Sequence, residues 1–245
     1  QYTLLRYGAM AAKWHEPPRD ALDTLTLEAA DIKSLDSVEQ TGYMPFDPII
    51  KRTEGTVREK GKSYKTTKGA PHVLLKLVIT QDGVTKEEAD RITKACEHDV
   101  HELGLRGIRA LAVAKTNPEN SDKWEMLGLL TFLDPPRIDT KQTISDAKAY
   151  GVMVKMITGD HLLIARETSR QLDLGLNIYN AEGLPILDMD TKKKPDNLSK
   201  DYGDLCLAAD GFAQVFPEHK YLVVECLREL GYKTGMTGDG VNDAP

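Results

Sequence analysis

The chain has 245 residues, enough for one large domain or two ordinary ones, and 40% hydrophobic with 29% charged residues is typical of a soluble globular protein. Lys and Arg number 32 against 38 Asp and Glu, and the net charge of −6 argues against nucleic acid or an anionic membrane surface as a main partner. Three widely spaced cysteines indicate reduced thiols in a cytosolic setting, and no apolar run approaches the roughly 20 residues of a membrane-spanning helix.

The first half of the chain is predicted to mix antiparallel strands with helices. Apolar spacing favours helices over residues 2–14, 20–30 and 87–103. Residues 56–58 and 63–67 flank a polar turn that contains Gly61, which predicts a β-hairpin. Residues 73–79 form a buried segment, and residues 108–114 and 124–132 are expected to be strands.

The pattern changes at Asp134-Pro135-Pro136-Arg137, after which predicted strands alternate with helices. The helices are expected over residues 138–150, 162–172 and 219–230, and the strands over residues 152–157 and 232–236. Such alternation indicates a parallel, Rossmann-like sheet, so the chain is predicted to be α/β. The polar stretch between Gly183 and Asp204, which includes Lys192 to Lys194, is interpreted as a solvated surface loop.

The last nine residues carry two carboxylates, Asp239 and Asp243, interleaved with glycines. A loop of this kind after a strand would present both carboxylates at the carboxyl edge of the sheet, where α/β proteins bind ligands. Paired carboxylates beside substrate phosphates suit Mg²⁺, and glycines let the backbone approach a phosphate closely. The string is therefore interpreted as a magnesium–phosphate site rather than an ordinary turn.

Two further segments fit phosphate chemistry. The predicted strand 152–157 ends in Thr158-Gly159-Asp160, where a hydroxyl and free amides precede a helix, although a simple helix cap explains the same residues equally well. Lys220 falls in the first turn of another helix, where a cation opposes the helix dipole, so phosphate neutralisation explains it better than a structural role. His219 is expected to pack or face solvent rather than to catalyse.

In the first half, Phe46 and Lys51 precede the hairpin, Lys68-Gly69 follow its second strand, and Arg109 begins a further strand. An aromatic face can stack on a purine while cations neutralise phosphates. Spacing alone does not establish this, because such a phenylalanine is more often a core residue and such a lysine more often solvated.

The set Thr158, Lys220, Asp239 and Asp243 resembles motifs two to four of the haloacid-dehalogenase superfamily. The wider order of motifs resembles the signature of P-type ATPases, and of plasma-membrane proton pumps in particular. The motifs that carry this resemblance are Pro45-Phe46-Asp47-Pro48, Lys68-Gly69-Ala70-Pro71, Asp134-Pro135-Pro136-Arg137, Thr158-Gly159-Asp160, Phe216-Pro217-Glu218-His219-Lys220 and the string from Met236 to Pro245.

The resemblance implies specific roles for these residues. Phe46 would stack on the adenine of ATP, with Lys51, Lys68 and Gly69 near the nucleotide and Arg109 at its phosphates. Asp134 and Arg137 would lie at a hinge between two domains. The transferred phosphoryl group would be held by Thr158, Gly159 and Asp160 and neutralised by Lys220, while Asp239 would bind Mg²⁺ with support from Asn242 and Asp243.

The resemblance further implies a nucleotide-binding domain over residues 1–134 and a phosphorylation domain over residues 135–245. The second domain is expected to be incomplete, because the nucleophile strand and the segment after Pro245 are missing from the pattern. The parent protein would use an aspartyl-phosphate to couple ATP hydrolysis to proton export across the plasma membrane. This soluble, cytoplasmic segment would work with the membrane and actuator domains of the same pump and would not be catalytically competent alone.

Two alternatives remain open from the sequence. A free-standing phosphatase of the same superfamily would need a nucleophile, for which Asp188 is the candidate although Lys192 and its place in the chain fit poorly. A non-catalytic nucleotide-binding module would bind ATP without needing Asp239.

Overall fold

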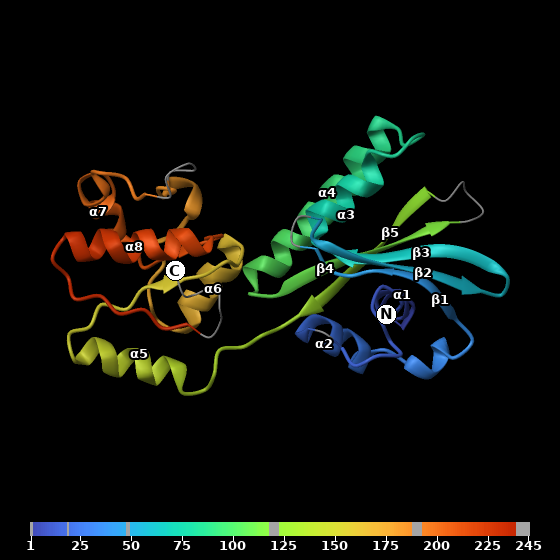
Figure 1. Cartoon of the computed structure of the whole chain (residues 1–245), viewed down its shortest axis with the longest axis horizontal. Coiled ribbons are helices and arrows are strands. Elements are labelled where there is room, and N and C mark those ends of the chain that lie inside the picture. Colours follow the sequence, from blue (N-terminus) through green and yellow to red (C-terminus); the bar gives the residue numbers. More distant parts are fainter. Residues whose placement is uncertain (1, 19, 48–49, 118–122, 188–192, 239–245) are drawn as a thin grey trace. The chain divides into compact units, whose positions relative to one another are not determined.

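A computed structural model describes residues 2–18, 20–47, 50–117, 123–187 and 193–238 (Figure 1). The chain divides into two compact units, Gln1–Leu103 with Ile108–Leu133, and Gly104–Gly107 with Asp134–Pro245. Each unit has its own hydrophobic clusters. Among the helices that the structure describes, none has both the length and the apolar content needed to cross a bilayer.

The first unit is built on an antiparallel sheet in the order β1-β2-β3-β4-β5. Its strands are β1 Glu39–Met44, β2 Arg52–Glu59, β3 Lys62–Gly69, β4 Arg109–Asn117 and β5 Lys123–Phe132. The predicted hairpin is confirmed and extends further at both ends, since β2 and β3 pair without a break from Arg52↔Gly69 to Glu59↔Lys62. Each strand therefore runs antiparallel to its neighbours. The end of β1, the start of β2, the end of β3 and the start of β4 consequently lie at the same end of the sheet.

Helices cover both faces of this sheet (Figure 1). The helices are α1 Tyr2–Met10, α2 Ala21–Ala29, α3 Pro71–Ile79 and α4 Lys86–Leu105, with a short 3-10 helix, η1, at Ile32–Leu35. Val57 of β2 packs with Met10 and Leu35 on the α1 face, whereas Ala112 and Ala114 of β4 pack under α3 on the other. Val113, between the two alanines, is also buried and lies near Gly8 of α1, so successive residues of β4 face opposite sides of the sheet, as expected of a strand covered on both sides.

The buried segment expected at residues 73–79 is helix α3. Pro71 occupies the first turn, where its missing N–H and fixed φ favour helix initiation. Leu74, Leu75 and Val78 are buried on one face of the helix, so the apolar run is a core helix rather than a strand.

The second unit contains a parallel sheet in the order β6-β8-β7. Its elements are α5 Thr140–Ala149, β6 Met156–Ile157, α6 Leu162–Gln171, β7 Ile178–Asn180, η2 Ala181–Gly183, α7 Leu198–Ala208, β8 Gly211–Ala213 and α8 Pro217–Glu229. Phe212 of β8 packs against α7 and α8, while its neighbour Ala213 packs against α6. The expected α/β class, with an antiparallel-sheet part followed by a Rossmann-like parallel sheet, is confirmed.

Several predicted elements differ from the observed ones. Only the last two residues of the predicted strand 152–157 pair as β6, and residues 232–236 form no strand. The described residues offer 232–236 no partner strand, and an extended segment becomes a strand only through such pairing. The insert read as a surface loop contains most of α7, and two strands that were not predicted, β7 and β8, flank it.

The described lysines of that insert include one with ion pairs to α8. Lys194 bridges two carboxylates of α8, Glu225 at 2.9 Å and Glu229 at 2.7 Å. Glu225 additionally pairs with Arg228. Residues 193–197 form a coil at the surface, as interpreted, and Lys194, whose side chain is 36% exposed, fastens this coil to α8.

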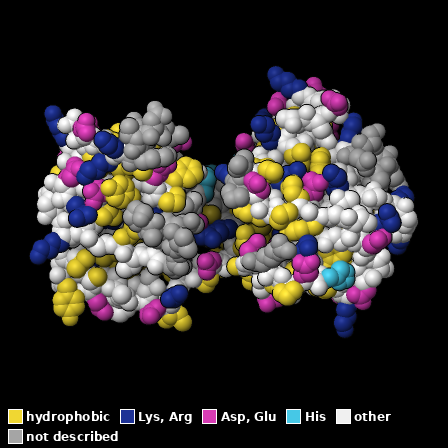
Figure 2. Space-filling view, in the orientation of Figure 1, with side chains coloured by type: hydrophobic (Ala, Val, Ile, Leu, Met, Phe, Trp, Pro, Cys, Tyr) yellow, Lys and Arg dark blue, Asp and Glu magenta, His cyan; other side chains and the backbone are white. Residues whose placement is uncertain are grey.

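The net charge is not concentrated on the face shown in Figure 2. Lys and Arg side chains are interspersed with Asp and Glu side chains over each unit. On this face, charge alone does not define a binding surface.

Candidate functional site

Four of the predicted nucleotide-site segments meet at one end of the five-stranded sheet. The register pairs Met44 with Glu54 and Arg52 with Gly69, and Gly69 in turn with Ala112. Phe46 and Lys51 thus lie in the connection from β1 to β2, Gly69 ends β3, and Arg109 starts β4 at this same end. Because neighbouring strands run in opposite directions, residues far apart in the sequence lie close together at this end of the sheet.

The connection that carries Lys51 packs directly against the end of β3. The backbone N–H of Ala70 donates to the Lys51 carbonyl at 3.1 Å, and the N–H of Lys51 donates to the Asp47 carbonyl at 2.7 Å. A Cβ at Gly69 would lie 2.5 Å from both the Lys51 carbonyl oxygen and the Arg52 Cβ. Gly69 is therefore needed because any side chain would collide with the chain that carries Lys51.

Phe46 is 56% exposed, which excludes the alternative that this phenylalanine is a core residue. An exposed aromatic ring at the end of a sheet is available to stack on a flat ligand. Lys51 is exposed as well. It adopts φ +55, which an L-residue rarely takes.

His72 belongs to the same region and was not singled out from the sequence. Its pKa is lowered by burial and by the nearby charge of Lys51. The sequence feature that could have identified His72 was its position next to Pro71, in the first turn of the helix that follows Gly69 and Ala70. The residue adds a neutral donor and acceptor next to the lysine.

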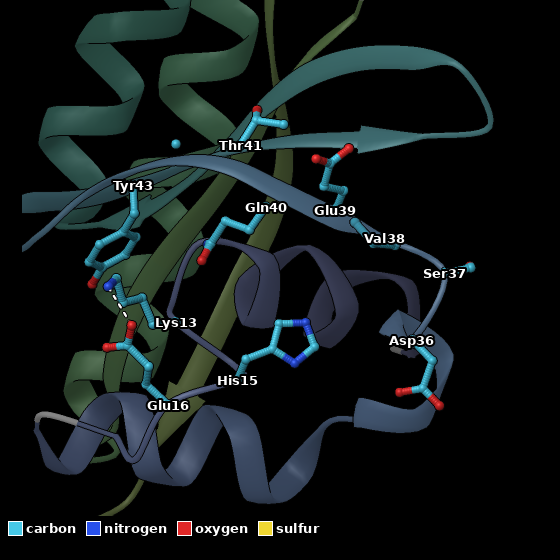
Figure 3. A pocket seen from close by; sticks show the side chains of 11 residues that line it. Lys13, His15, Glu16, Asp36, Ser37, Val38, Glu39, Gln40, Thr41 and Tyr43 are labelled. Atoms are coloured by element: carbon cyan, nitrogen blue, oxygen red, sulfur yellow. Dashed lines mark hydrogen bonds and ion pairs between the residues drawn. The ribbon is translucent and has the colours of Figure 1, made fainter.

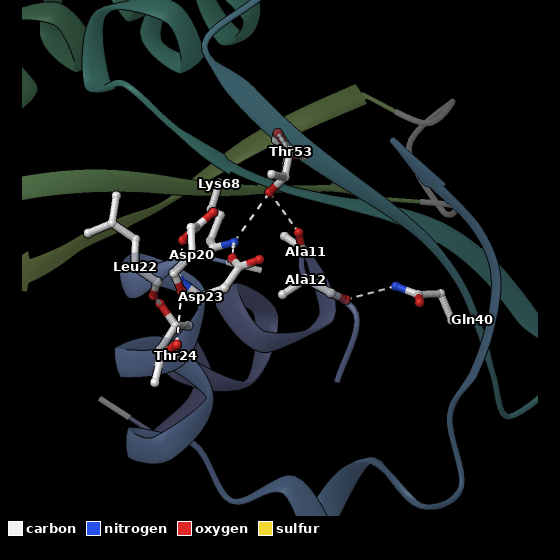
Figure 4. Close-up of polar contacts among 11 residues, drawn as sticks. Ala11, Ala12, Asp20, Leu22, Asp23, Thr24, Gln40, Thr53 and Lys68 are labelled. Atoms are coloured by element: carbon white, nitrogen blue, oxygen red, sulfur yellow. Dashed lines mark hydrogen bonds and ion pairs between the residues drawn. The ribbon is translucent and has the colours of Figure 1, made fainter. Parts of the chain in front are cut away.

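Lys68, which the resemblance places near the nucleotide, is buried, so the alternative of a solvated lysine is excluded for this residue. Its side chain is 3% exposed, and its ammonium forms a buried ion pair with Asp23 of α2 (Figure 4). The ammonium also donates to the Thr53 hydroxyl at 3.4 Å, and that hydroxyl donates to the Ala11 carbonyl at 2.6 Å. The sequence did not identify Asp23 as a site residue, because its position three residues after the N-cap Asp20 indicates only the start of a helix.

The remaining predicted residues of the first site are exposed. Arg109 stands at the start of β4, and Asp134 and Arg137 lie between β5 and α5. Their exposure leaves them accessible to a ligand or to another part of the protein.

A groove of about 800 Å³ runs along β1 beside the connection between α1 and α2 (Figure 3). It is lined by Lys13, His15, Glu16 and residues 36–43. Lys13 pairs with Glu16 at 2.6 Å and lies 5.8 Å from the centre of the Tyr43 ring. The groove contains none of the predicted nucleotide residues, although Tyr43 precedes Phe46 by only three positions.

In the second unit, the loops that follow β6 and β8 are joined by backbone hydrogen bonds. Val215 donates to the Thr158 carbonyl at 3.1 Å, and Gln214 donates to the Asp160 carbonyl at 2.9 Å. The Thr158 hydroxyl accepts the N–H of Asp160 at 3.1 Å. The predicted Thr158-Gly159-Asp160 loop therefore lies at the carboxyl edge of the sheet, beside the segment that leads into α8.

Lys220 is half-buried in the first turn of α8. His219 is buried and accepts a hydrogen bond from the Phe216 backbone at Nδ1, so the expectation that it packs is confirmed. The structure brings the start of α8 to the same edge as the Thr158 loop, because β8 and β6 are paired neighbours.

The remaining predicted residues, Asp239, Asn242, Asp243 and the alternative nucleophile Asp188, lie outside the described residues. Within the residues whose structure is described, no group of three or more His, Cys, Asp or Glu side chains is placed to hold a metal ion. The case for Mg²⁺ thus rests on the sequence of the last nine residues.

No protein-family profile matches the chain, but individual proteins do. It is 54% identical over 97% of its length to "Probable proton ATPase 1A" of Leishmania donovani. It is 43% identical to "Plasma membrane ATPase" of Neurospora crassa and 41% identical to "Plasma membrane ATPase 1" of Saccharomyces cerevisiae, each over 99% of its length. The chain spans only about a quarter of the relatives it matches, 24% to 26% of their length.

The first unit has an antiparallel sheet with an aromatic ring and cationic side chains at one end, and the second has a parallel α/β sheet with a Thr-Gly-Asp loop. This combination fits the P-type ATPases. The extent and identity of the matches agree with that class. The chain belongs to this family, in its group of plasma-membrane proton ATPases.

Proposed function

We propose that this chain is the part of a proton-exporting P-type ATPase that binds ATP and holds the transferred phosphoryl group. The observation that carries the proposal is the convergence of Phe46, Lys51, Gly69 and Arg109 at one end of the antiparallel sheet. An exposed ring, exposed cations and a glycine that allows close backbone packing are suited to a purine nucleotide.

Within this proposal the two parts of the chain have separate tasks. Residues 1–134 form the nucleotide-binding domain, where Phe46 stacks on adenine and Lys51 and Arg109 face the phosphates. Asp134 and Arg137 lie in the connection to residues 135–245, the phosphorylation domain. Their exposure supports a hinge role, because exposed connecting segments carry few contacts that resist bending.

In the phosphorylation domain, the Thr158 hydroxyl and the Gly159 amide bind the phosphoryl oxygens, the Asp160 N–H holds that hydroxyl in place at 3.1 Å, and Lys220 offsets the phosphoryl charge. Phosphoryl transfer depends mainly on such positioning and charge stabilisation. Mg²⁺ would be held by Asp239, with Asn242 and Asp243 in support, and would neutralise phosphate charge when bound. In the parent pump an aspartyl-phosphate would link ATP hydrolysis to proton export, and the membrane and actuator domains would be partners of this cytoplasmic segment.

The test is calorimetric titration of the chain with a non-hydrolysable ATP analogue. Phe46→Ala should weaken binding by about tenfold, since stacking of a base on an aromatic ring contributes about 1–3 kcal/mol. Tyr150→Ala is the matched control, because Tyr150 is also an exposed aromatic residue, at 89%, but lies at the end of α5 in the other unit. Unchanged affinity in Phe46→Ala, or equal loss in both variants, would contradict the proposed site.

A phosphate-release assay on the same samples separates the alternatives. The proposed function predicts nucleotide binding without steady phosphate release by this chain. Release that Asp188→Ala abolishes would instead identify a phosphatase. Nucleotide affinity that is the same with and without Mg²⁺, and unchanged in Asp239→Ala, would favour a non-catalytic binding module.

A further inference from the structure

We infer that the groove along β1 is a docking site for an extended, basic peptide segment of a partner protein, which joins the sheet as an additional strand. β1 stands at one edge of the sheet, where its neighbour among the described strands is β2 alone. The backbone of an edge strand offers N–H and C=O groups to which a further strand can pair. The groove contains none of the predicted nucleotide residues, so the inference does not depend on ATP binding.

The shape of the groove suits an extended chain. One wall is the continuous stretch of residues 36–43, and the other is formed by Lys13, His15 and Glu16 in the connection between α1 and α2 (Figure 3). A strand rises about 3.3 Å per residue, so a segment of roughly equal length can follow the first wall from end to end. A strand-like occupant therefore contacts the groove along its whole length, which a compact ligand would not.

The two walls are already fixed to each other in the free protein. Gln40 of β1 donates from Nε2 to the Ala12 carbonyl at 2.9 Å. Val38 and Trp14 belong to the same buried cluster on the α1 face of the sheet. Both contacts hold β1 against the connection that forms the opposite wall, so a partner binds without first ordering the groove, which favours affinity.

The charges of the groove favour a basic occupant. Its lining has three carboxylates, those of Glu16, Asp36 and Glu39, against one lysine, and Lys13 already pairs with Glu16 at 2.6 Å. Asp36 and Glu39 are exposed, and the pair that Glu39 forms with Arg58 is itself open to solvent and therefore weak. Basic side chains of a partner can thus approach these two carboxylates, and the charge complementarity speeds and orients binding.

Acidic residues lie on both sides of the strand. Figure 3 shows the Glu39 side chain on one side of β1 and the Tyr43 ring directed toward Lys13 and Glu16 on the other. Because the side chains of a strand alternate between its two sides, an added strand turns half of its side chains toward Glu39 and half toward Glu16. The best occupant therefore has basic residues on both sides rather than on one.

A second copy of the chain fits this edge less well than a basic peptide. Pairing of β1 with β1 of another copy would bring the carboxylates of both copies into one groove, where like charges oppose binding. The register with β2 breaks between Gln40 and Gly42, and such a bulge twists an edge strand, which disfavours the pairing of identical edges. A basic segment avoids the repulsion and can follow the twist, since it is not constrained by a fold of its own before it binds.

The experiment titrates the whole chain into a fluorescein-labelled peptide of three Lys-Thr-Val repeats, with fluorescence anisotropy as the readout. Successive lysines of this peptide fall on opposite sides of a strand. Saturable binding is expected, and Asp36→Lys/Glu39→Lys should weaken it by about tenfold, because two attractive charge contacts become repulsive. Glu87→Lys/Glu97→Lys is the control matched in net charge, since both residues are exposed on α4 of the same unit, and it should leave the affinity unchanged.

Two further peptides separate strand addition from attraction by charge alone. Proline in place of each valine keeps the lysines but removes N–H donors, and should weaken binding by at least about tenfold. Glutamate in place of each lysine should abolish saturable binding. When the original peptide binds, hydrogen exchange of residues 39–43 should slow while that of α4 stays the same.

Several results would overturn the inference. They are no binding of the original peptide, equal binding of the proline peptide, equal loss of affinity in the two charge-reversed proteins, and unchanged hydrogen exchange in residues 39–43. A dimer of the free chain in sedimentation that the peptide dissociates would overturn it too, because a second copy would then be the occupant of the groove.

Discussion

The Nδ1 atom of His219 accepts a hydrogen bond from the backbone N–H of Phe216 at 3.0 Å, closing the first turn of α8 immediately before Lys220. Burial lowers the pKa of His219 below its ordinary value of 6.5, against the opposing effect of Glu218. The neutral imidazole is required, because a protonated ring has no free Nδ1 lone pair to accept this bond. The turn that presents Lys220 thus depends on an uncharged histidine.

A pH dependence of stability follows from this bond. Between the lowered pKa of His219 and 6.5 the unfolded chain binds more protons than the folded one, so stability falls as pH decreases through 6.5. His219→Asn keeps an acceptor and does not titrate, so its stability should fall less steeply than wild type from pH 7 to 5 in urea unfolding monitored by circular dichroism. Parallel curves for the two proteins would contradict the prediction. The pKa of His72 is lowered as well, and its effect cancels in this comparison.

Removal of one member of the Lys68–Asp23 pair should destabilise the first unit strongly. Lys68→Met leaves a buried carboxylate without a partner, which costs about 3–5 kcal/mol. The double variant Asp23→Leu/Lys68→Met removes both charges and should recover most of this loss. Trp14 and Trp124, the two tryptophans of the chain, both belong to the first unit, so their fluorescence in urea reports this unfolding directly. A double variant as unstable as Lys68→Met would show that uncompensated charge is not the cause.

Gly69→Ala should perturb the end of β3. The new methyl group would lie 2.5 Å from the Lys51 carbonyl, and relief of such overpacking typically costs about 1–3 kcal/mol. Gly42→Ala is a milder comparison, because its methyl would be 3.3 Å from Thr56. We expect tryptophan-monitored stability to fall more in Gly69→Ala than in Gly42→Ala. The reverse order would mean that the Lys51 segment is free to move away from β3.

Lys155 should stabilise the end of α7. Its ammonium donates to the carbonyls of Leu207 at 2.8 Å and Ala209 at 2.5 Å, and burial lowers its pKa. Lys155→Met removes both bonds and should destabilise the second unit by about 1–3 kcal/mol, with faster hydrogen exchange of the Ala209 amide. Lys200→Met, an exposed lysine on α7 itself, is the control and should leave that exchange rate unchanged.

Much of the fold was predictable because its signals are local. Helices α2, α4 and α6 follow from apolar spacing in their own sequence, and the hairpin of β2 and β3 follows from the polar turn at Gly61. The short strands β7 and β8 were missed because each has three residues, too few to show a period. Residues 232–236 were wrongly assigned to a strand because apolar content signals burial but does not supply a pairing partner.

The sequence by itself determined the kinds of residue available at the candidate sites, their order along the chain and the family signature, since these depend on residue identity and spacing alone. Only the tertiary structure decided that Phe46 is exposed, that Lys68 is buried against Asp23, and that His219 closes the turn before Lys220. Asp23 and Lys68 are 45 positions apart, and strand register with helix packing brings them together. Pairing over such a distance is set by the summed packing of many residues, so no local pattern reveals it.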